Sequence, residues 1–98
     1  MDMLIIASHV EVPGEQRDAF VAASQDLVER ARRAPGCHDV AITADPTNPC
    51  RVYNYERWES WEHVKAWRAV ANAPETGIPM VADDVQAYEI AVVRPPFD

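Results

Sequence analysis

The sequence lacks the features that mark a membrane, secreted or nucleic-acid-binding protein. Its 98 residues contain no apolar run near the roughly 20 residues that span a bilayer, and its start lacks the basic region and cleavage site of a signal peptide. Nine Lys and Arg face sixteen Asp and Glu, and the resulting net charge of −7 argues against nucleic acid or anionic lipid as a partner. We therefore expect a cytoplasmic protein that binds neither nucleic acid nor membrane.

Cysteine and histidine are also scarce. The two cysteines, Cys37 and Cys50, fall at opposite ends of a predicted hairpin, on the order of 20 Å apart, which is too far for a disulfide. The three histidines are far apart in sequence and form no zinc-binding pattern with the cysteines. We expect free thiols and no metal site.

Hydrophobic periodicity organises residues 1–98 as a single domain. With 48% hydrophobic and 26% charged residues, the chain has an ordinary globular composition. The pattern predicts strands at 4–12, 38–44, 51–58 and 85–93, a turn at 45–49, and an irregular segment with one short helical turn at 72–84. It predicts helices at 15–33, ended by Ala34-Pro35-Gly36, and at 61–71, with Ser60 as the N-cap. This order predicts an α+β fold, a ferredoxin-like β-α-β-β-α-β sandwich in which two helices cover one face of a four-stranded antiparallel sheet.

The other face of the sheet is expected to bind a second copy of the chain. On the first strand, apolar side chains occur at both parities, with Leu4 and Ile6 on one side and Ile5 and Ala7 on the other. A sheet with one solvated face shows a cleaner polar side than this. We therefore predict a homodimer that packs through the open sheet faces.

Alternation along 51–58 predicts which side chains meet beneath the helices. Four residues share the buried side of this strand: Val52, Asn54, Glu56 and Trp58. If Ala44 pairs with Cys50 across the turn, Val40 lies opposite Asn54, Ile42 opposite Val52, and His38 opposite Glu56. The amide and the indole are then expected to face one cavity.

The segment N-Y-x-x-W-E-S at 54–60, between a strand and a helix, resembles the antibiotic biosynthesis monooxygenase family of dimeric α+β barrels. The Pro35-Gly36 pair before the second strand is also typical of that family. The resemblance implies a dimer with a pocket for an aromatic or quinol-like molecule, which some members oxidise with O₂ and without flavin, haem or metal. No cofactor is therefore expected.

The resemblance also suggests site residues. Asn54 and Trp58 match residues implicated in catalysis in the branch that oxidises anthrones, whereas the tyrosine of that branch is replaced by Val64. Trp67 matches a tryptophan of the haem-degrading branch. In that branch the first-strand position, Ser8 here, is an Asn, and the chain has no histidine after His63 to serve as the haem ligand.

These residues define a candidate mechanism. Asn54 would stabilise the substrate anion, as an oxyanion donor does, while Trp58 and Trp67 would stack on the ring and donate to it from their indole N–H groups. His38, oriented by Glu56, is the first choice as proton acceptor, and a water held by Ser8 is the second. The predicted pocket wall is completed by Val40 and Val64.

Three functions are compatible with these residues. The leading hypothesis is a cofactor-independent monooxygenase that acts on an anthrone, quinol or aromatic polyketide. The first alternative is a non-catalytic dimer that binds an aromatic metabolite, because Asn54 and both tryptophans could be ordinary interior residues. Haem degradation is a third interpretation. His38 and Glu56 could likewise form a plain cross-strand ion pair.

Overall fold

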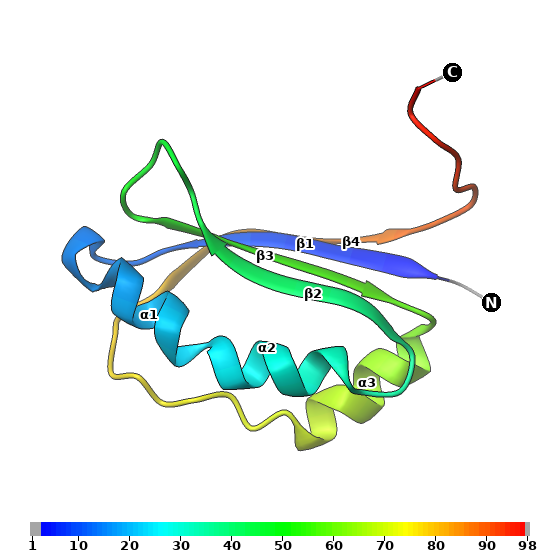
Figure 1. The fold of residues 1–98 in the computed structure, drawn as a ribbon, viewed down its shortest axis with the longest axis horizontal. Helices are drawn as coiled ribbons and strands as arrows, with labels where there is room; N and C mark the ends of the chain where they lie inside the picture. The colour runs from blue at the N-terminus through cyan, green and yellow to red at the C-terminus, as the bar shows by residue number, and fades with distance from the viewer. Residues whose placement is uncertain (1–2, 98) are drawn as a thin grey trace.

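The chain folds into two layers, a four-stranded antiparallel sheet and a layer of helices against one of its faces (Figure 1). The structure is a computed structural model that describes residues 3–97, with the backbone alone at residues 82 and 83. The elements are β1 (Leu4–Glu11), a 3-10 turn (Gly14–Gln16), α1 (Arg17–Ala23), α2 (Gln25–Arg32), β2 (Cys37–Ala44), β3 (Arg51–Trp58), α3 (Trp61–Val70) and β4 (Val81–Glu89). Within this part of the chain, no helix has the length and apolar character that crossing a bilayer requires.

The strands lie in the order β2-β3-β1-β4, and each neighbouring pair is antiparallel. This order places the two central strands, β3 and β1, between edge strands β2 and β4. It is the arrangement of a ferredoxin-like sandwich, in which two β-α-β units interlock in one sheet. The predicted fold class is therefore confirmed.

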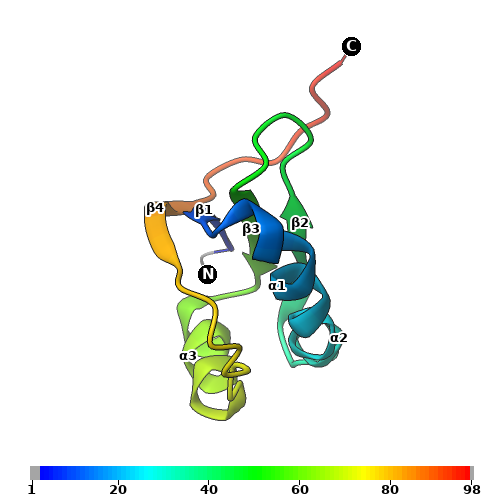
Figure 2. The ribbon, with the colours of Figure 1, turned by 90° about the vertical axis from the view of Figure 1, so that its left-hand side faces the viewer.

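The register of the sheet assigns each side chain to one of two faces, because side chains alternate along a strand. Leu4 lies opposite Trp58 and Ser8 opposite Asn54, so these four side chains share the helix-covered face. Figure 2 shows α1 and α2 beneath the β2 side of the sheet and α3 beneath the β4 side. The other side, called the open face below, includes Ile5, Ala7, His9, Tyr53, Tyr55, Arg57 and Tyr88.

The hydrophobic core lies where the helices meet the start of β1 and the end of β3. Trp58 is the largest of the fully buried side chains, and Leu4 and Val64 beside it are likewise 0% exposed. Three more buried residues complete this cluster: Ile6, Ala31 and Val40. The core therefore joins three strands to both helical segments through one aromatic side chain of β3.

The turn before β2 is fixed by a glycine. Gly36 has φ +78°, a left-handed conformation that favours glycine, and a Cβ there would collide with the ring of His63 on α3. The Glu59 backbone N–H donates to Gly36 O at 2.7 Å, which ties this turn to the corner between β3 and α3. In that corner Ser60 caps α3, as predicted, because its Oγ accepts the His63 N–H.

Side chains close the outer edge of β2 at Val40. Arg32 Nε donates to Val40 O at 2.8 Å, and the Val40 N–H donates to Asp39 Oδ1 at 2.9 Å. An unpaired strand edge otherwise presents free donors and acceptors to other chains. This point of the edge therefore has its backbone groups satisfied within the chain.

The single helix predicted at 15–33 is wrong in detail, because the helix breaks at Ser24. Ser24 Oγ donates to the Phe20 carbonyl oxygen at 3.0 Å, a local bond that competes with regular helical bonding and bends helices. The segment consequently forms the 3-10 turn, α1 and α2 in succession. Its apolar stripe still faces the sheet, with Ala31 buried and Val28 packed against the core.

The predicted pairing of the hairpin was wrong by two residues. Val40 lies opposite Glu56, Ile42 opposite Asn54 and Ala44 opposite Val52. The cause is the turn: Asp45 Oδ1 accepts the backbone N–H groups of the residues two and three positions later, at 2.7 and 2.9 Å. These bonds lower the pKa of Asp45 to about 2 and leave residues 46–50 as the loop.

The predictions for the segment before β4 also need correction. The expected helical turn within 72–84 is absent, and residues 71–80 are irregular. β4 begins at Val81, where it pairs with Glu11, and ends at Glu89, where it pairs with Leu4, instead of spanning 85–93. The ends of β4 are therefore set by its pairing with the full length of β1, and not by the hydrophobic pattern of β4.

Two glycine substitutions test the contact between the turn and α3. Gly36→Ala is expected to lower the free energy of unfolding by about 2–4 kcal/mol, because a left-handed alanine costs about 1–2 kcal/mol and the methyl group meets His63. Gly77→Ala is the control, since Gly77 has a similar φ of +73° with nothing within 4 Å of the added carbon. Urea unfolding followed by tryptophan fluorescence measures both. Equal losses would show that His63 moves aside without cost.

Candidate functional site

The candidate site centres on Asn54, in the middle of the helix-covered face. β3 is a central strand, and Asn54 lies between Ser8 of β1 and Ile42 of β2. All three side chains are half-buried. The two-residue error in the hairpin pairing preserves parity, so the face expected for Asn54 is the one observed. Its expected neighbour Val40 instead lies beside Glu56, one pleat farther along the sheet.

The Asn54 amide oxygen has no hydrogen-bond partner in the described part of the chain. This oxygen, Oδ1, is buried. A buried polar atom without a partner costs about 1–3 kcal/mol, and native proteins rarely retain one without a reason. An amide that can donate and accept is therefore available to a bound molecule.

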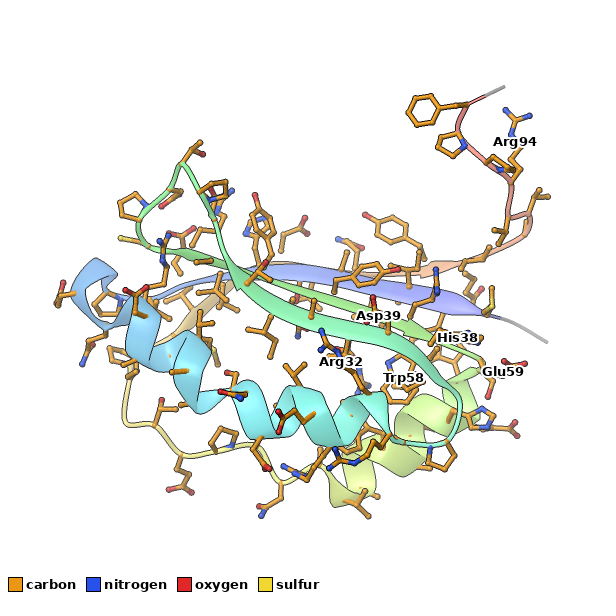
Figure 3. The ribbon with its side chains drawn as sticks, viewed as in Figure 1. Arg32, His38, Asp39, Trp58, Glu59 and Arg94 are labelled. Carbon is orange, nitrogen blue, oxygen red and sulfur yellow. The ribbon has the colours of Figure 1, made fainter. Side chains whose placement is uncertain are left out.

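Trp58 forms the apolar end of the site. Its ring stacks on Trp67 of α3, with 6.4 Å between the ring centroids and 28° between the planes. Arg30 of α2 lies over the other ring of this pair, with its guanidinium carbon 5.6 Å from the Trp67 centroid. Figure 3 shows Trp58 in the layer between the sheet and the helices. Trp58 is thus part of the core, and the half-buried Trp67 is the more accessible of the two rings.

Glu56 lies between the amide and the indole along β3. Trp58 Nε1 donates to Glu56 Oε1 at 2.9 Å, so this indole N–H is not free for a substrate, contrary to the sequence-based hypothesis. On either side Glu56 faces the buried residues Ile6 and Val40. A carboxylate therefore occupies the helix-covered face beside the unpartnered amide.

The helices cover this face unevenly. Val85 of β4 lies opposite Ser8, on the same face, yet its side chain is 56% exposed. α1 and α2 lie under one side of the sheet and α3 under the other, with residues 71–80 running between α3 and β4 (Figure 2). The β4 side of the helix-covered face is therefore less covered than the β2 side at Val85.

His38 does not lie opposite Glu56, so this predicted pair is wrong. The pairing of β2 with β3 shifts between Cys37 and Asp39, which leaves His38 at a bulge. Its Nε2 is 2.9 Å from Glu59 Oε1, and both side chains are substantially exposed at the end of the sheet (Figure 3). The structure therefore does not bring His38 to Asn54.

The position of Cys37 is set by the same register shift. It lies opposite Trp58 instead of Arg57 as predicted, and both cysteines are free, as expected. Burial, with the nearby carboxylates of Asp39 and Glu56, raises the pKa of the Cys37 thiol. A thiol that stays protonated is a poor nucleophile and a poor metal ligand. Among the described residues, no three His, Cys, Asp or Glu side chains gather as a metal site.

The remaining predicted wall residue and two neighbours are accounted for by packing. Val64 is fully buried in the core, behind the tryptophan pair. Trp61 packs against the core and donates from Nε1 to Glu89 Oε2 at 2.9 Å. His63 is half-buried, with Nδ1 2.7 Å from Ser60 Oγ.

The sequence analysis missed two contributors to the site. Val85 was assigned to β4, but the absent alternation in 81–89 gave no sign of its face. The bond from Trp58 to Glu56 had a usable signal, because residues two apart on a strand share a face and a buried indole needs an acceptor. A hollow of about 370 Å³ lies against the edge of β2 and shares Ile42 with this site. It is lined by Val21, Ala22, Gln25, Val28, Glu29, Arg32, Ala41, Ile42 and Thr43.

Solved structures share this fold. A Chloroflexus aurantiacus protein, named as a candidate antibiotic biosynthesis monooxygenase, is 26% identical, with 95% of this chain and 97% of that chain covered at a TM-score of 0.75. A conserved Bacteroides thetaiotaomicron protein of unknown function is 18% identical over 91% and 98% of the two chains, also at 0.75. The haem-degrading protein Rv3592 of Mycobacterium tuberculosis is 15% identical over 96% and 97%, at 0.67. At such low identity the last two show the fold alone.

Sequence comparison gives the family. An uncharacterised Synechocystis protein, sll1783, is 27% identical over 59 residues, and the match spans 60% of this chain but only 40% of that protein's length. The antibiotic biosynthesis monooxygenase family model matches residues 3–73, which include β1, the helices, the hairpin and every candidate site residue except Val85. The chain therefore belongs to the antibiotic biosynthesis monooxygenase family.

Proposed function

We propose that the protein is a cofactor-independent monooxygenase that oxidises an anthrone, a quinol or a related aromatic polyketide with O₂. The observation that carries this proposal is the Asn54 amide, whose Oδ1 is buried without a partner among the described residues, on the same face of β3 as Trp58. Family membership adds the reaction class. A buried amide with an unpartnered oxygen, on the face that also carries the stacked tryptophan pair, suits a planar molecule with a polar group that can hydrogen-bond to it.

In the proposed reaction the substrate supplies the electrons. An acidic C–H or O–H of the substrate loses its proton, and the resulting anion, held by the Asn54 amide, transfers electrons to O₂. For an anthrone, the methylene carbon loses both hydrogens and becomes a carbonyl, one oxygen atom enters the product, and the other leaves as water. Preorganised donors of this kind contribute roughly 10² to 10³ in rate.

The tryptophan pair has a different role from the one expected. Because Trp58 is fully buried and its N–H is bound, it supports the pocket rather than donating to the substrate. Trp67 offers the accessible ring for stacking, with Ser8 and Val85 on the sheet side. His38 as proton acceptor stays a prediction, although its contact with Glu59 does not favour it.

A non-catalytic binder of an aromatic metabolite is the second candidate. The observation that favours it is the burial of Trp58, which gives the matched family residue a sufficient structural reason to be present. Such a binder would use the same amide and the same Trp67 ring but would consume no O₂. A cytoplasmic location is proposed with either function.

We also propose that a second copy of the chain covers the open face. Tyr53 and Tyr88 on this face are 40% and 55% exposed, so two large aromatic side chains face outward from the sheet. The segment after β4 rises from this face (Figure 3) and encloses a hollow of about 390 Å³, whose lining is mainly apolar: Met3, Ile5, Arg57, Ile90, Val92, Val93 and Arg94.

Oxygen consumption tests the proposed reaction. Purified protein is expected to consume O₂ with at least one of anthrone, 1,8-dihydroxyanthrone and a naphthoquinol, and Asn54→Ala is expected to lower the rate roughly 10² to 10³-fold. An oxygen electrode and product absorbance measure the rate. Binding of these probes without uptake favours the binder. A Soret shift on adding haem would instead support the haem-degrading interpretation.

Unfolding experiments test whether Asn54 is merely structural. Because its amide has no partner, Asn54→Ala is expected to leave the free energy of unfolding unchanged or to raise it by about 1 kcal/mol. Asn48→Ala is the control, since Asn48 Oδ1 accepts the Cys50 N–H at 3.0 Å and its loss should cost about 1 kcal/mol. A loss above about 2 kcal/mol for Asn54→Ala would indicate a structural role.

Sedimentation velocity tests the dimer. The wild-type chain is expected to sediment as a dimer, and Tyr88→Glu is expected to shift it to monomer, because the charge would be buried between two sheets. Val70→Glu is the control, since Val70 is 67% exposed on α3, away from the open face. Dimers that survive Tyr88→Glu, or monomers in the wild type, contradict the proposed interface.

A further inference from the structure

We propose that Glu56 is the group that accepts the proton from the bound substrate, an inference that rests on the proposed oxidation. Glu56 and Asn54 are two residues apart on β3 and share the helix-covered face. Side chains at this spacing stand about 7 Å apart, a distance that one aromatic ring bridges. A substrate whose oxygen meets the amide can therefore present an acidic hydrogen to the carboxylate.

The surroundings of Glu56 are unusual for a carboxylate. Its two cross-strand neighbours, Ile6 and Val40, are only 4% and 5% exposed. Glutamate is rarely placed among buried aliphatic side chains unless it is paired. Among the described residues, no cation forms an ion pair with it. The Glu56 carboxylate is therefore not held by a cationic partner in the described part of the chain.

A hydrogen bond from Trp58 orients the Glu56 side chain. Trp58 Nε1 donates to Oε1 at 2.9 Å, and no group among residues 3–97 bonds to the second oxygen, Oε2. Because the indole ring is held in the core, it fixes the position of the carboxylate as well. One oxygen is therefore anchored and the other is available to the substrate.

The chain contains a second pair of an indole and a carboxylate, which shows what a purely structural role for such a pair looks like. Trp61 Nε1 donates to Glu89 Oε2, also at 2.9 Å, but that contact is exposed at the edge of the sheet. Glu89 lies opposite Leu4, four residues from Ser8 along β1 and away from Asn54. Glu89 is therefore a matched comparison for Glu56. It accepts an indole N–H in the same way but does not have the Asn54 amide beside it.

The proposed step is a simple proton transfer. The C–H bond of the substrate methylene, or the O–H bond of a quinol, breaks, and an O–H bond forms on Glu56 Oε2. The electron pair stays on the substrate as an enolate or phenolate, whose oxygen the Asn54 amide stabilises. The carboxylic acid later returns its proton to water. This step needs no O₂, so it can be measured apart from oxidation.

Hydrogen exchange without oxygen tests this step. Anthrone and 1,8-dihydroxyanthrone are incubated with protein in D₂O under argon, and ¹H NMR follows loss of the methylene signal. The wild type is expected to accelerate exchange, and Glu56→Gln is expected to lower the protein-catalysed rate by about 100-fold or more. Glu56→Asp, which keeps a base in a shifted position, should retain part of the rate.

Three controls keep the result interpretable. Glu89→Gln makes the same chemical change at the matched indole pair and should leave exchange unchanged. Glu56→Gln retains a carbonyl oxygen that can accept the Trp58 N–H, so its thermal midpoint should stay close to the wild type. Quenching of tryptophan fluorescence by each probe reports whether the variants still bind it.

The outcomes separate this inference from the proposed function. If the exchange rate of Glu56→Gln is within threefold of the wild-type rate, Glu56 is not the proton acceptor, even if O₂ uptake persists. Exchange that depends on Glu56, without O₂ uptake, supports Glu56 and contradicts the monooxygenase. A wild type that binds the probes without accelerating exchange overturns the inference, and one that binds neither probe contradicts both proposals.

Discussion

The burial of Trp58 is the constraint on which the rest of the structure depends. Its indole lies between β1, β2 and α3. Truncating a buried ring of this size to alanine typically lowers the free energy of unfolding by about 3–5 kcal/mol. A buried indole N–H requires an acceptor, and Glu56 supplies it. The packing that stabilises the fold therefore also brings a carboxylate to the helix-covered face, beside Asn54. Core and candidate site share the same strand and cannot vary independently.

Features that depend on local chemistry were readable from the sequence. Alternation along 51–58 placed Asn54, Glu56 and Trp58 on one face, and this held even though the pairing was wrong by two residues, because an even shift preserves parity. Ser60 was identified as a cap from its position before an amphipathic segment. Pro35-Gly36 predicted a break, and the left-handed φ of Gly36 explains it.

Features that depend on tertiary context were not readable. The hairpin pairing was fixed by Asp45, whose carboxylate organises the loop, and no periodicity in the sequence reveals that choice. The same two-residue shift in the pairing places Val40, and not His38, opposite Glu56, and a further register shift between Cys37 and Asp39 leaves His38 at a bulge. The start of β4 was missed because its first residues pair with β1 without an apolar pattern of their own. For these reasons the candidate proton acceptor differs between the sequence analysis, which favoured His38, and the structure, which favours Glu56.

The closed edge of β2 limits how molecules of this protein can associate. With Val40 engaged by Arg32 and by Asp39, an incoming strand cannot extend the sheet at that point without first breaking two internal bonds. Lateral, ladder-like growth of the kind seen in fibrils is disfavoured there. One guanidinium, from Arg32, and one carboxylate, from Asp39, thereby act as a local barrier to strand-by-strand association.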